Sequence, residues 1–186
     1  MNRLPSDARN QPLGNFERDS TEEWSGEYLS AANGPVEFKF PTGWFKNEES
    51  NPYDLQVLSE HQRMNTGVFL YGAEDLTEEH DPIDLLEQQI DDLDSKRKNF
   101  KEVEEEKVVR LEGKTLTTVV YSGEEGSSRH FYKFTLVEFT ANPELMVVLL
   151  QVSIPSYWAT NKSVLEAIAA SGRIWTQSPQ DHRGLN

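Results

Sequence analysis

Cysteine is absent from all 186 residues of this chain. Its absence excludes disulfide bonds, thiolate metal ligands and cysteine nucleophiles. Long apolar runs are also missing: no stretch approaches the roughly 18 residues that a transmembrane helix needs, and no apolar segment of a signal peptide follows Met1. If the protein is anchored as a lipoprotein, we therefore expect its lipidated cysteine to precede residue 1.

Positive charge is scarce as well. The chain has 18 lysine and arginine residues against 32 acidic residues, which gives a net charge of -14. Nucleic acid is bound through clustered lysine and arginine side chains, so we expect no nucleic-acid partner. The densest basic run, Lys96–Lys98, comes near the end of a predicted helix, where cations complement the helix dipole.

Catalytic signatures are missing too. Ser95–Lys98 matches the S-x-x-K pattern of penicillin-binding enzymes, but neither S-D-N nor K-T-G follows it. No G-x-S-x-G nucleophile turn, glycine-rich phosphate loop or H-E-x-x-H zinc motif occurs. The sequence therefore predicts a protein that is not an enzyme and that needs no cofactor.

What the sequence does contain is a dense run of β-strands from Thr115 to Ile154. The segment Glu144–Ile154 is apolar on both faces, because Leu145, Val147 and Leu149 alternate with a second apolar row. Side chains of a strand point alternately to opposite faces, so this strand must be covered on both sides. The second row consists of Met146, Val148, Leu150, Val152 and Ile154, and we expect it to lie beneath a helix.

Two helices are expected to provide the cover. Asp81 and Pro82 are typical of a helix start, and apolar residues at helical spacing follow until about Asn99. Ser156 is the expected cap of a second helix that ends at Gly172. Other predicted strands are Trp24–Ser30, Val36–Phe40, Leu55–Leu58, Gly67–Tyr71 and a charged edge strand, Val103–Leu111, and a flexible loop is expected over Ser122–Ser128.

These elements predict a three-layer α/β/α sandwich around a largely antiparallel sheet, because the links between consecutive strands are of hairpin length. We expect a single domain over residues 24–175. Residues 1–23 are polar with scattered apolar positions and are expected to form a disordered leader, and residues 176–186 form a polar tail.

The order of these elements resembles the PsbP/Mog superfamily, in particular its short bacterial members. The resemblance covers roughly residues 28–175 and rests on Phe40–Trp44 (FPTGW), Leu111–Lys114 (LEGK), Val152–Pro155 (VSIP) and Ala170–Ile174 (ASGRI). It implies a non-enzymatic binding platform that docks a protein partner, as in photosystem II accessory proteins, Ran-binding proteins, envelope lipoproteins and effector chaperones. The long insertions of the nuclear members are absent, which argues against Ran binding. The cysteine-free start, the polar leader and the length favour an extracytoplasmic protein of the bacterial envelope or thylakoid lumen.

Aromatic residues near chain turns are the candidate partner-binding residues. They are Trp44, Phe45, Tyr53 and Tyr157, and an exposed aromatic patch is typical of a protein interface. For Trp44 and for Trp158 the alternative is that they fill the ends of the sandwich, since aromatic side chains carry much of a core's burial.

An acidic segment before the first helix is the alternative site. Around His80 lie Glu74, Asp75, Glu78, Glu79, Asp81 and Asp84, which would suit a basic partner, a small ligand, an unrecognised enzyme site or a hard cation. No metal site is expected, because acidic residues also favour a helix N-terminus and no calcium-loop motif is present. If a cation does bind, Glu78, His80, Asp81 and Asp84 are its candidate ligands. A deep pocket with converging polar groups would favour the ligand-binding alternative over partner docking.

Overall fold

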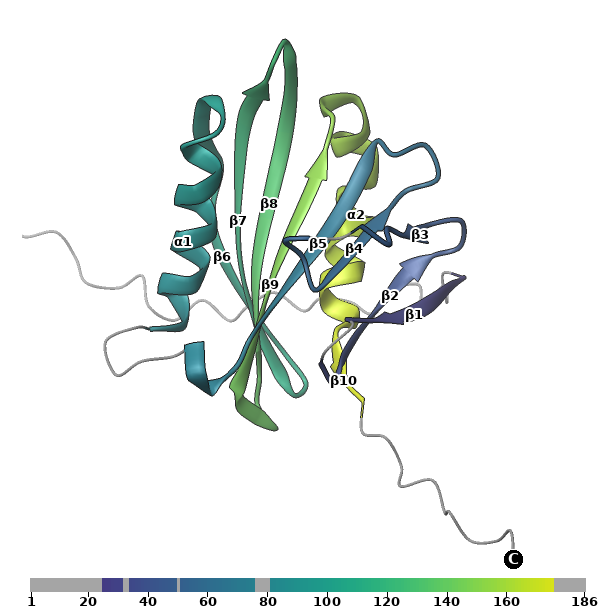
Figure 1. The fold of residues 1–186 in the computed structure, drawn as a ribbon, viewed down its shortest axis with the longest axis vertical. Coiled ribbons are helices and arrows are strands. Elements are labelled where there is room, and N and C mark those ends of the chain that lie inside the picture. Colours follow the sequence, from purple (N-terminus) through teal and green to yellow (C-terminus); the bar gives the residue numbers. More distant parts are fainter. Residues whose placement is uncertain (1–24, 32–33, 50, 76–80, 176–186) are drawn as a thin grey trace, which may run out of the picture.

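The fold is built on one large antiparallel sheet with a helix on either side (Figure 1). The computed structural model describes residues 25–31, 34–49, 51–75 and 81–175. The expected leader and tail, and Trp24, lie outside the described residues. None of the described helices has the length and apolar character needed to cross a membrane.

The large sheet has seven strands in the order β3-β4-β5-β9-β8-β7-β6, and all its pairs are antiparallel. The predicted three-strand meander is confirmed as β7, β8 and β9, which are neighbours in this sheet, and the charged strand is confirmed at its edge. The strands are β3 (Phe45–Lys46), β4 (Leu55–Leu58), β5 (Met64–Tyr71), β6 (Lys98–Leu111), β7 (Lys114–Glu125), β8 (Ser128–Phe139) and β9 (Asn142–Ser153).

A second, three-stranded sheet was not predicted. It joins β1 (Gly26–Ser30), β2 (Val36–Pro41) and β10 (Arg173–Ile174) in the order β1-β2-β10. Val36, Phe38 and Phe40 alternate along β2 and are fully or almost fully buried. They pack in one cluster with Leu165 and Ile168 of helix α2 (Pro155–Ser171), so the small sheet and α2 share one side of the large sheet.

The two faces of β9 carry separate cores, as its apolar rows predict. Val147 and Leu149 pack on the α2 side, while Met146, Val148 and Leu150 pack against helix α1 (Pro82–Asp94). These five residues are at most 5% exposed. The mixed α/β fold with two helices and mostly antiparallel sheets is therefore confirmed, and the second sheet is added to the expected layers.

Several boundaries differ from the predictions. Strand β5 starts at Met64 rather than Gly67, and β6 starts at Lys98 rather than Val103. Helix α1 starts as expected, with an Asp81–Asp84 capping box, but it ends at Asp94 rather than near Asn99, because Ser95 caps it and β6 begins at Lys98. Helix α2 is capped by Ile154 rather than Ser156. The loop expected over Ser122–Ser128 is a tight turn, since the β7–β8 ladder continues to the pair Glu125–Ser128.

Candidate functional site

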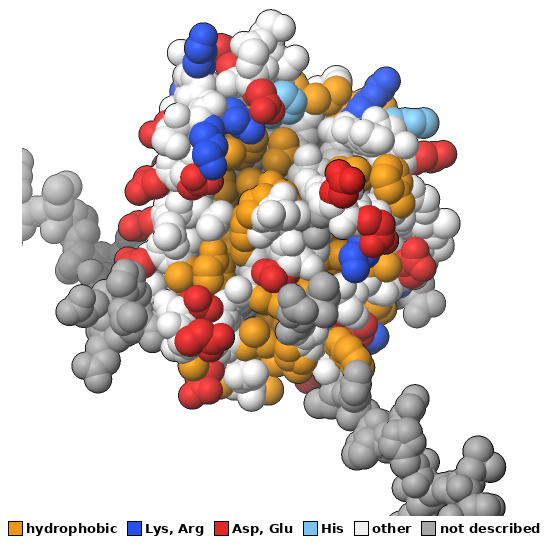
Figure 2. Space-filling model, viewed as in Figure 1, with side chains coloured by type: hydrophobic (Ala, Val, Ile, Leu, Met, Phe, Trp, Pro, Cys, Tyr) orange, Lys and Arg blue, Asp and Glu red, His pale blue; other side chains and the backbone are white. Residues whose placement is uncertain are grey.

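A cleft of about 170 Å³ lies on the α1 side of the large sheet, at the end where α1 finishes. We call it the α1-face cleft. Figure 2 shows basic side chains and a histidine gathered around hydrophobic surface at the upper end of this face. The lining residues come from α1, from the ends of several strands and from the links between elements: Tyr53, Gln62, Arg63, Asn65, Leu93, Arg97, Glu125, His130, Tyr132, Leu150, Val152 and Ile154.

Arg97 lines the cleft and is held by four groups, one of which is the Lys96 carbonyl oxygen, 3.2 Å from Arg97 Nη1. It follows the end of α1, and its backbone N–H donates to Asp94 O at 3.2 Å. Its Nε donates to Tyr132 Oη at 3.0 Å, and its Nη2 lies 3.2 Å from a carboxylate oxygen of Glu125. The expectation that Lys96–Lys98 complement the helix dipole was wrong, because α1 ends at Asp94 with no basic residue in its last turn and β6 begins at Lys98. The Arg97 side chain turns onto the sheet instead.

Arg63 also lines the cleft and belongs to the link between β4 and β5. Its Nη1 donates to Tyr157 Oη at 2.7 Å, and its guanidinium carbon lies 5.0 Å from the centre of the Tyr157 ring. The link is kept tight by two backbone bonds, from Ser59 N–H to Met64 O and from Gln62 N–H to Ser59 O. The two arginines outnumber the single carboxylate of Glu125, so the cleft carries local positive charge on a chain of net charge -14.

Two polar atoms of the cleft lack a protein partner among the described residues. Asn65 Oδ1 and His130 Nδ1 are buried and make no hydrogen bond there. Burying a polar atom without a partner is unfavourable, and such atoms in a native protein usually meet a bound molecule or water. The guanidinium groups of Arg63 and Arg97, which also line the cleft, are the donors that it offers to an entering group.

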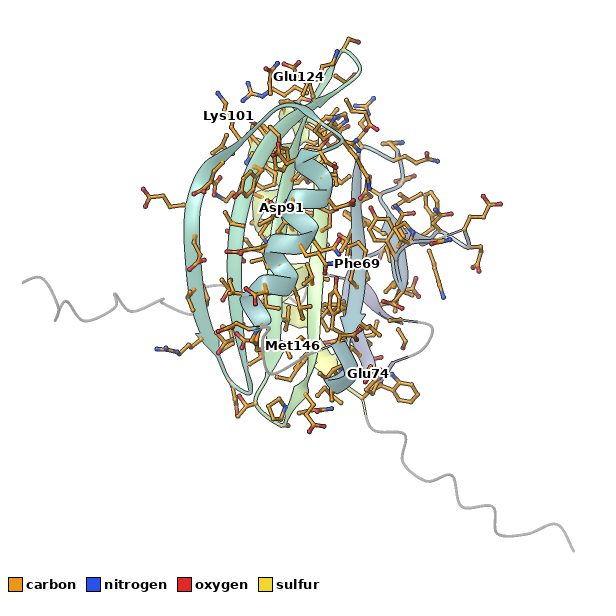
Figure 3. All side chains as sticks on the ribbon, turned by 60° about the vertical axis from the view of Figure 1, so that its left-hand side comes forward. Phe69, Glu74, Asp91, Lys101, Glu124 and Met146 are labelled. Carbon is orange, nitrogen blue, oxygen red and sulfur yellow. The ribbon has the colours of Figure 1, made fainter. Side chains whose placement is uncertain are left out.

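Two tyrosines, Tyr53 and Tyr132, also line the cleft. The Tyr53 ring lies 4.9 Å from the Phe69 ring, centre to centre, and Figure 3 shows Phe69 on β5 beside α1. Burial raises the pKa of the Tyr53 hydroxyl, although nearby Arg97 acts in the opposite direction. Burial likewise raises the pKa of Tyr132, partly offset by its hydrogen bond from Arg97. Both phenols are therefore protonated at neutral pH and can donate hydrogen bonds.

Three of the predicted aromatic residues lie near this cleft. Phe45 pairs with Leu58, which pairs with Asn65, and directly opposed residues share a face of the sheet. Phe45 is 41% exposed on that face. Tyr53 lines the cleft, and Tyr157 contacts Arg63 at its wall. Their role in partner binding remains a prediction.

The two tryptophans are core residues. Trp44 is 9% exposed and packs 6.1 Å from the Phe40 ring on the α2 side, away from the other three candidates. Trp158 is 8% exposed and stacks on Phe131 at 5.2 Å. Both positions agree with the alternative of core packing.

Only part of the acidic segment, Glu74, Asp75, Asp81 and Asp84, lies within the described residues. Asp81 accepts from Ile83 N–H, and Asp84 accepts from Asp81 N–H, so both carboxylates cap α1. Asp75, in the short helix η1 (Ala73–Asp75), accepts from Gly72 N–H. No three metal-binding side chains converge within the described part of the chain. Glu78, Glu79 and His80 lie outside the described residues, so a cation or basic partner at this segment remains a hypothesis.

A larger cavity of about 370 Å³ lies between β6 and the β7–β8 hairpin. Figure 3 shows Lys101 and Glu124 at this end of the sheet. Four of its polar side chains already pair with one another: Asn99 donates to Glu124 at 3.0 Å, and Arg129 donates to Ser122 at 3.3 Å. The smaller α1-face cleft, with its unpartnered atoms and aromatic lining, is therefore the better candidate for binding.

Comparison with solved structures identifies the fold. The cyanobacterial PsbP protein (CyanoP) of Synechocystis sp. PCC 6803 superimposes with a TM-score of 0.62 over 82% of this chain and 94% of its own, at 15% identity. The chain has a PsbP/Mog-like fold. No protein-family model and no curated protein matches its sequence.

Two further structures share this fold. LpqN of Mycobacterium tuberculosis, which is involved in cell envelope biogenesis, matches with a TM-score of 0.56 over 81% of this chain and 86% of its own, at 12% identity. The Ran-binding protein Mog1p of Saccharomyces cerevisiae also matches with a TM-score of 0.56, over 81% of this chain and 96% of its own, at 11% identity. At such identities the likeness shows the fold alone.

Proposed function

We propose that this protein is a non-enzymatic accessory protein that docks a protein partner through the α1-face cleft. The observation that carries the proposal is the combination of Arg63 and Arg97 with exposed or half-buried aromatic residues on one face of a rigid sheet. Arginine and tyrosine are the residues most often found at the energetic centre of protein interfaces.

The size of the cleft favours a protein partner over a small ligand. Sites that enclose small molecules usually measure about 300–1,000 Å³, and this cleft measures about 170 Å³. A volume of that size suits one or two side chains of a larger partner. The fold supports a binding role as well, since Mog1p is a Ran-binding protein.

The chemistry of the cleft suggests which group of the partner enters it. Leu93, Leu150 and Val152 form an apolar floor, while Arg63 and Arg97 stand at the walls. We expect the partner to insert an apolar or aromatic side chain next to a carboxylate, because a carboxylate pairs well with arginine donors. An extracytoplasmic location in the bacterial envelope or thylakoid lumen, on an α/β/α scaffold, is part of the proposal. It is supported by the likeness to LpqN and to the cyanobacterial PsbP.

The test is capture of the partner from source-cell extract by purified bait proteins. Phe45→Ala combined with Tyr53→Ala should abolish capture of the band that the wild-type bait retains, while thermal unfolding stays cooperative. The matched control is Val103→Ala combined with Val108→Ala, which removes exposed hydrophobic side chains from the edge strand β6 instead. If both double variants lose capture to the same extent, the result would contradict a specific role for the cleft.

The competing acidic site is tested with the same assay. Neutralising Glu78, Glu79 and Asp81 to their amides should leave capture unchanged if the partner docks at the cleft. Capture that survives the aromatic double variant but fails with these amides would place the interface at the acidic segment and overturn the proposal. Weakening of that capture by salt would then be expected, because exposed charges are screened.

A further inference from the structure

The lysine at position 133 is buried on the side of the sheet that faces α2. It lies in the middle of β8 and is only 3% exposed. Its Nζ donates to Thr135 Oγ1 at 3.1 Å and to Gln151 Oε1 at 3.0 Å. Gln151 is fixed in turn, because its Nε2 donates to Leu165 O of α2 at 3.0 Å. A lysine ammonium has three N–H donors, and these two hydrogen bonds use only two of them.

Both partners of the Lys133 ammonium are neutral. No ion pair within the described ranges includes Lys133, and its charged surroundings nearly cancel. Glu166 and Lys162 face it from α2, and Glu104 and Lys107 face it from β6. Glu104 is already paired with Lys162, so the two lysines and two glutamates sum to zero. The charge of Lys133 therefore has no dedicated counterion.

A cavity of about 270 Å³ opens beside this amine, between α2 and strands β6, β7 and β8. Among the described lining residues, the polar ones besides Lys133 are Lys107, Thr118 and Glu166. The rest of the lining is aliphatic, provided by Val109, Leu111, Leu116, Ala167, Ala169 and Ala170. The cavity is separate from the α1-face cleft, because it lies across the sheet.

We propose that this cavity binds a small amphiphilic carboxylate, whose acid group pairs with Lys133 Nζ and whose apolar body lies between α2 and β6. Charge complementarity selects the head group, since a buried cation without a counterion gains most from an anion that brings its own charge. The aliphatic walls select the body, and the volume is close to the lower end of the range for small-molecule sites. This site is independent of partner docking at the cleft.

The ionisation of Lys133 gives the site a characteristic pH dependence. Burial lowers the pKa of Lys133 to about 8, so the amine is still largely protonated at neutral pH. A bound carboxylate favours the ammonium form and raises that pKa. Binding should therefore take up protons near pH 8, and it should be about tenfold weaker at pH 9 than at pH 7, where the free amine is charged.

Isothermal titration with sodium octanoate and with 1-octanol tests the proposal on the full chain. We expect octanoate to bind about tenfold or more tightly than octanol at neutral pH, the difference expected for a charge-assisted hydrogen bond. Lys133→Met keeps an unbranched apolar stem as far as Cε but removes the amine, so it should remove that preference. Lys46→Met, an exposed lysine on β3, is the matched control and should change nothing.

A second variant keeps the test decisive if Lys133→Met does not fold. Glu166→Gln removes a negative charge beside the cavity, on the exposed surface of α2, and should strengthen octanoate binding without affecting octanol. Equal binding of octanoate and octanol by the wild-type protein would overturn the proposal. Binding of neither probe, or octanoate binding that is the same at pH 7 and pH 9, would overturn it too.

Discussion

The ring of Tyr53 lies directly on the backbone of Gly67. A Cβ atom added at Gly67 would come within 2.2 Å of Tyr53 Cδ1, too close for any side chain. Gly67→Ala should therefore displace the ring from the α1-face cleft. We expect a loss of about 1–3 kcal/mol in the free energy of unfolding, as for other overpacked sites, measured by urea denaturation.

The double variant Gly67→Ala with Tyr53→Ala is the control for that prediction. Removing the ring makes room for the new methyl group, so the two changes should not add up. Gly67→Ala should lower the free energy of unfolding by less in the Tyr53→Ala background than in the wild type. Strictly additive losses would show that the ring does not rest on Gly67.

Truncating Leu150 should destabilise the protein strongly, because this residue belongs to the core on the α1 side. It is 5% exposed on β9 and packs in the cluster that holds Leu86 and Leu93 of α1. Leu150→Ala should lower the free energy of unfolding by about 2–5 kcal/mol, because it leaves a cavity. Val108→Ala on the exposed edge strand should cost about 0.5 kcal/mol or less. A loss below about 1 kcal/mol for Leu150→Ala would show that α1 does not cover this strand firmly.

Stability should rise with pH because of Lys133. Its pKa is lowered from 10.5 to about 8 in the folded protein, chiefly by burial. Below pH 8 both states hold the proton, and the full cost of burying the ammonium is present. Between about pH 8 and 10.5 only the unfolded state still binds the proton, so the free energy of unfolding increases with pH, by up to about 3 kcal/mol.

That rise should end near pH 10, where tyrosines begin to ionise in the unfolded chain. Burial raises the pKa of four tyrosines in the folded protein, so their contribution to stability is lost as pH increases further: Tyr53, Tyr71, Tyr121 and Tyr132. Denaturation series at several pH values should show a clearly smaller rise for Lys133→Met than for the wild type, because burial also lowers the pKa of Lys114, which the variant keeps. A parallel rise in both proteins would assign it to another group.

The sequence predicts those helices and strands that are determined by residues close together in the chain. The two apolar rows of Glu144–Ile154 indicate a strand covered on both sides, and Asp81 with Pro82 marks the start of α1. The second sheet escapes prediction because β10 is only two residues long and pairs with β2 through the Arg173–Glu37 register, far apart in the chain. Short strands of this kind carry no periodicity of their own.

The α1-face cleft escapes prediction for a related reason. More than thirty residues separate Arg63 from Arg97, and again Arg97 from His130. Only the strand register brings the three together. Tyr53 and Tyr157 could be proposed from their residue type, but not the arginines beside them. Gln151 was one sequence signal of the second site, since it interrupts an apolar face of β9 and proves to hold Lys133.

Amide hydrogen exchange of the protein alone and with its captured partner tests partner docking at the α1-face cleft most directly. Docking should slow exchange in the link Glu60–Arg63, which is exposed, and around His130. Exchange along the outer strand β6 should be unchanged. Protection confined to β6 or to the outer surface of α2, with none at Glu60–Arg63, would contradict docking at the cleft.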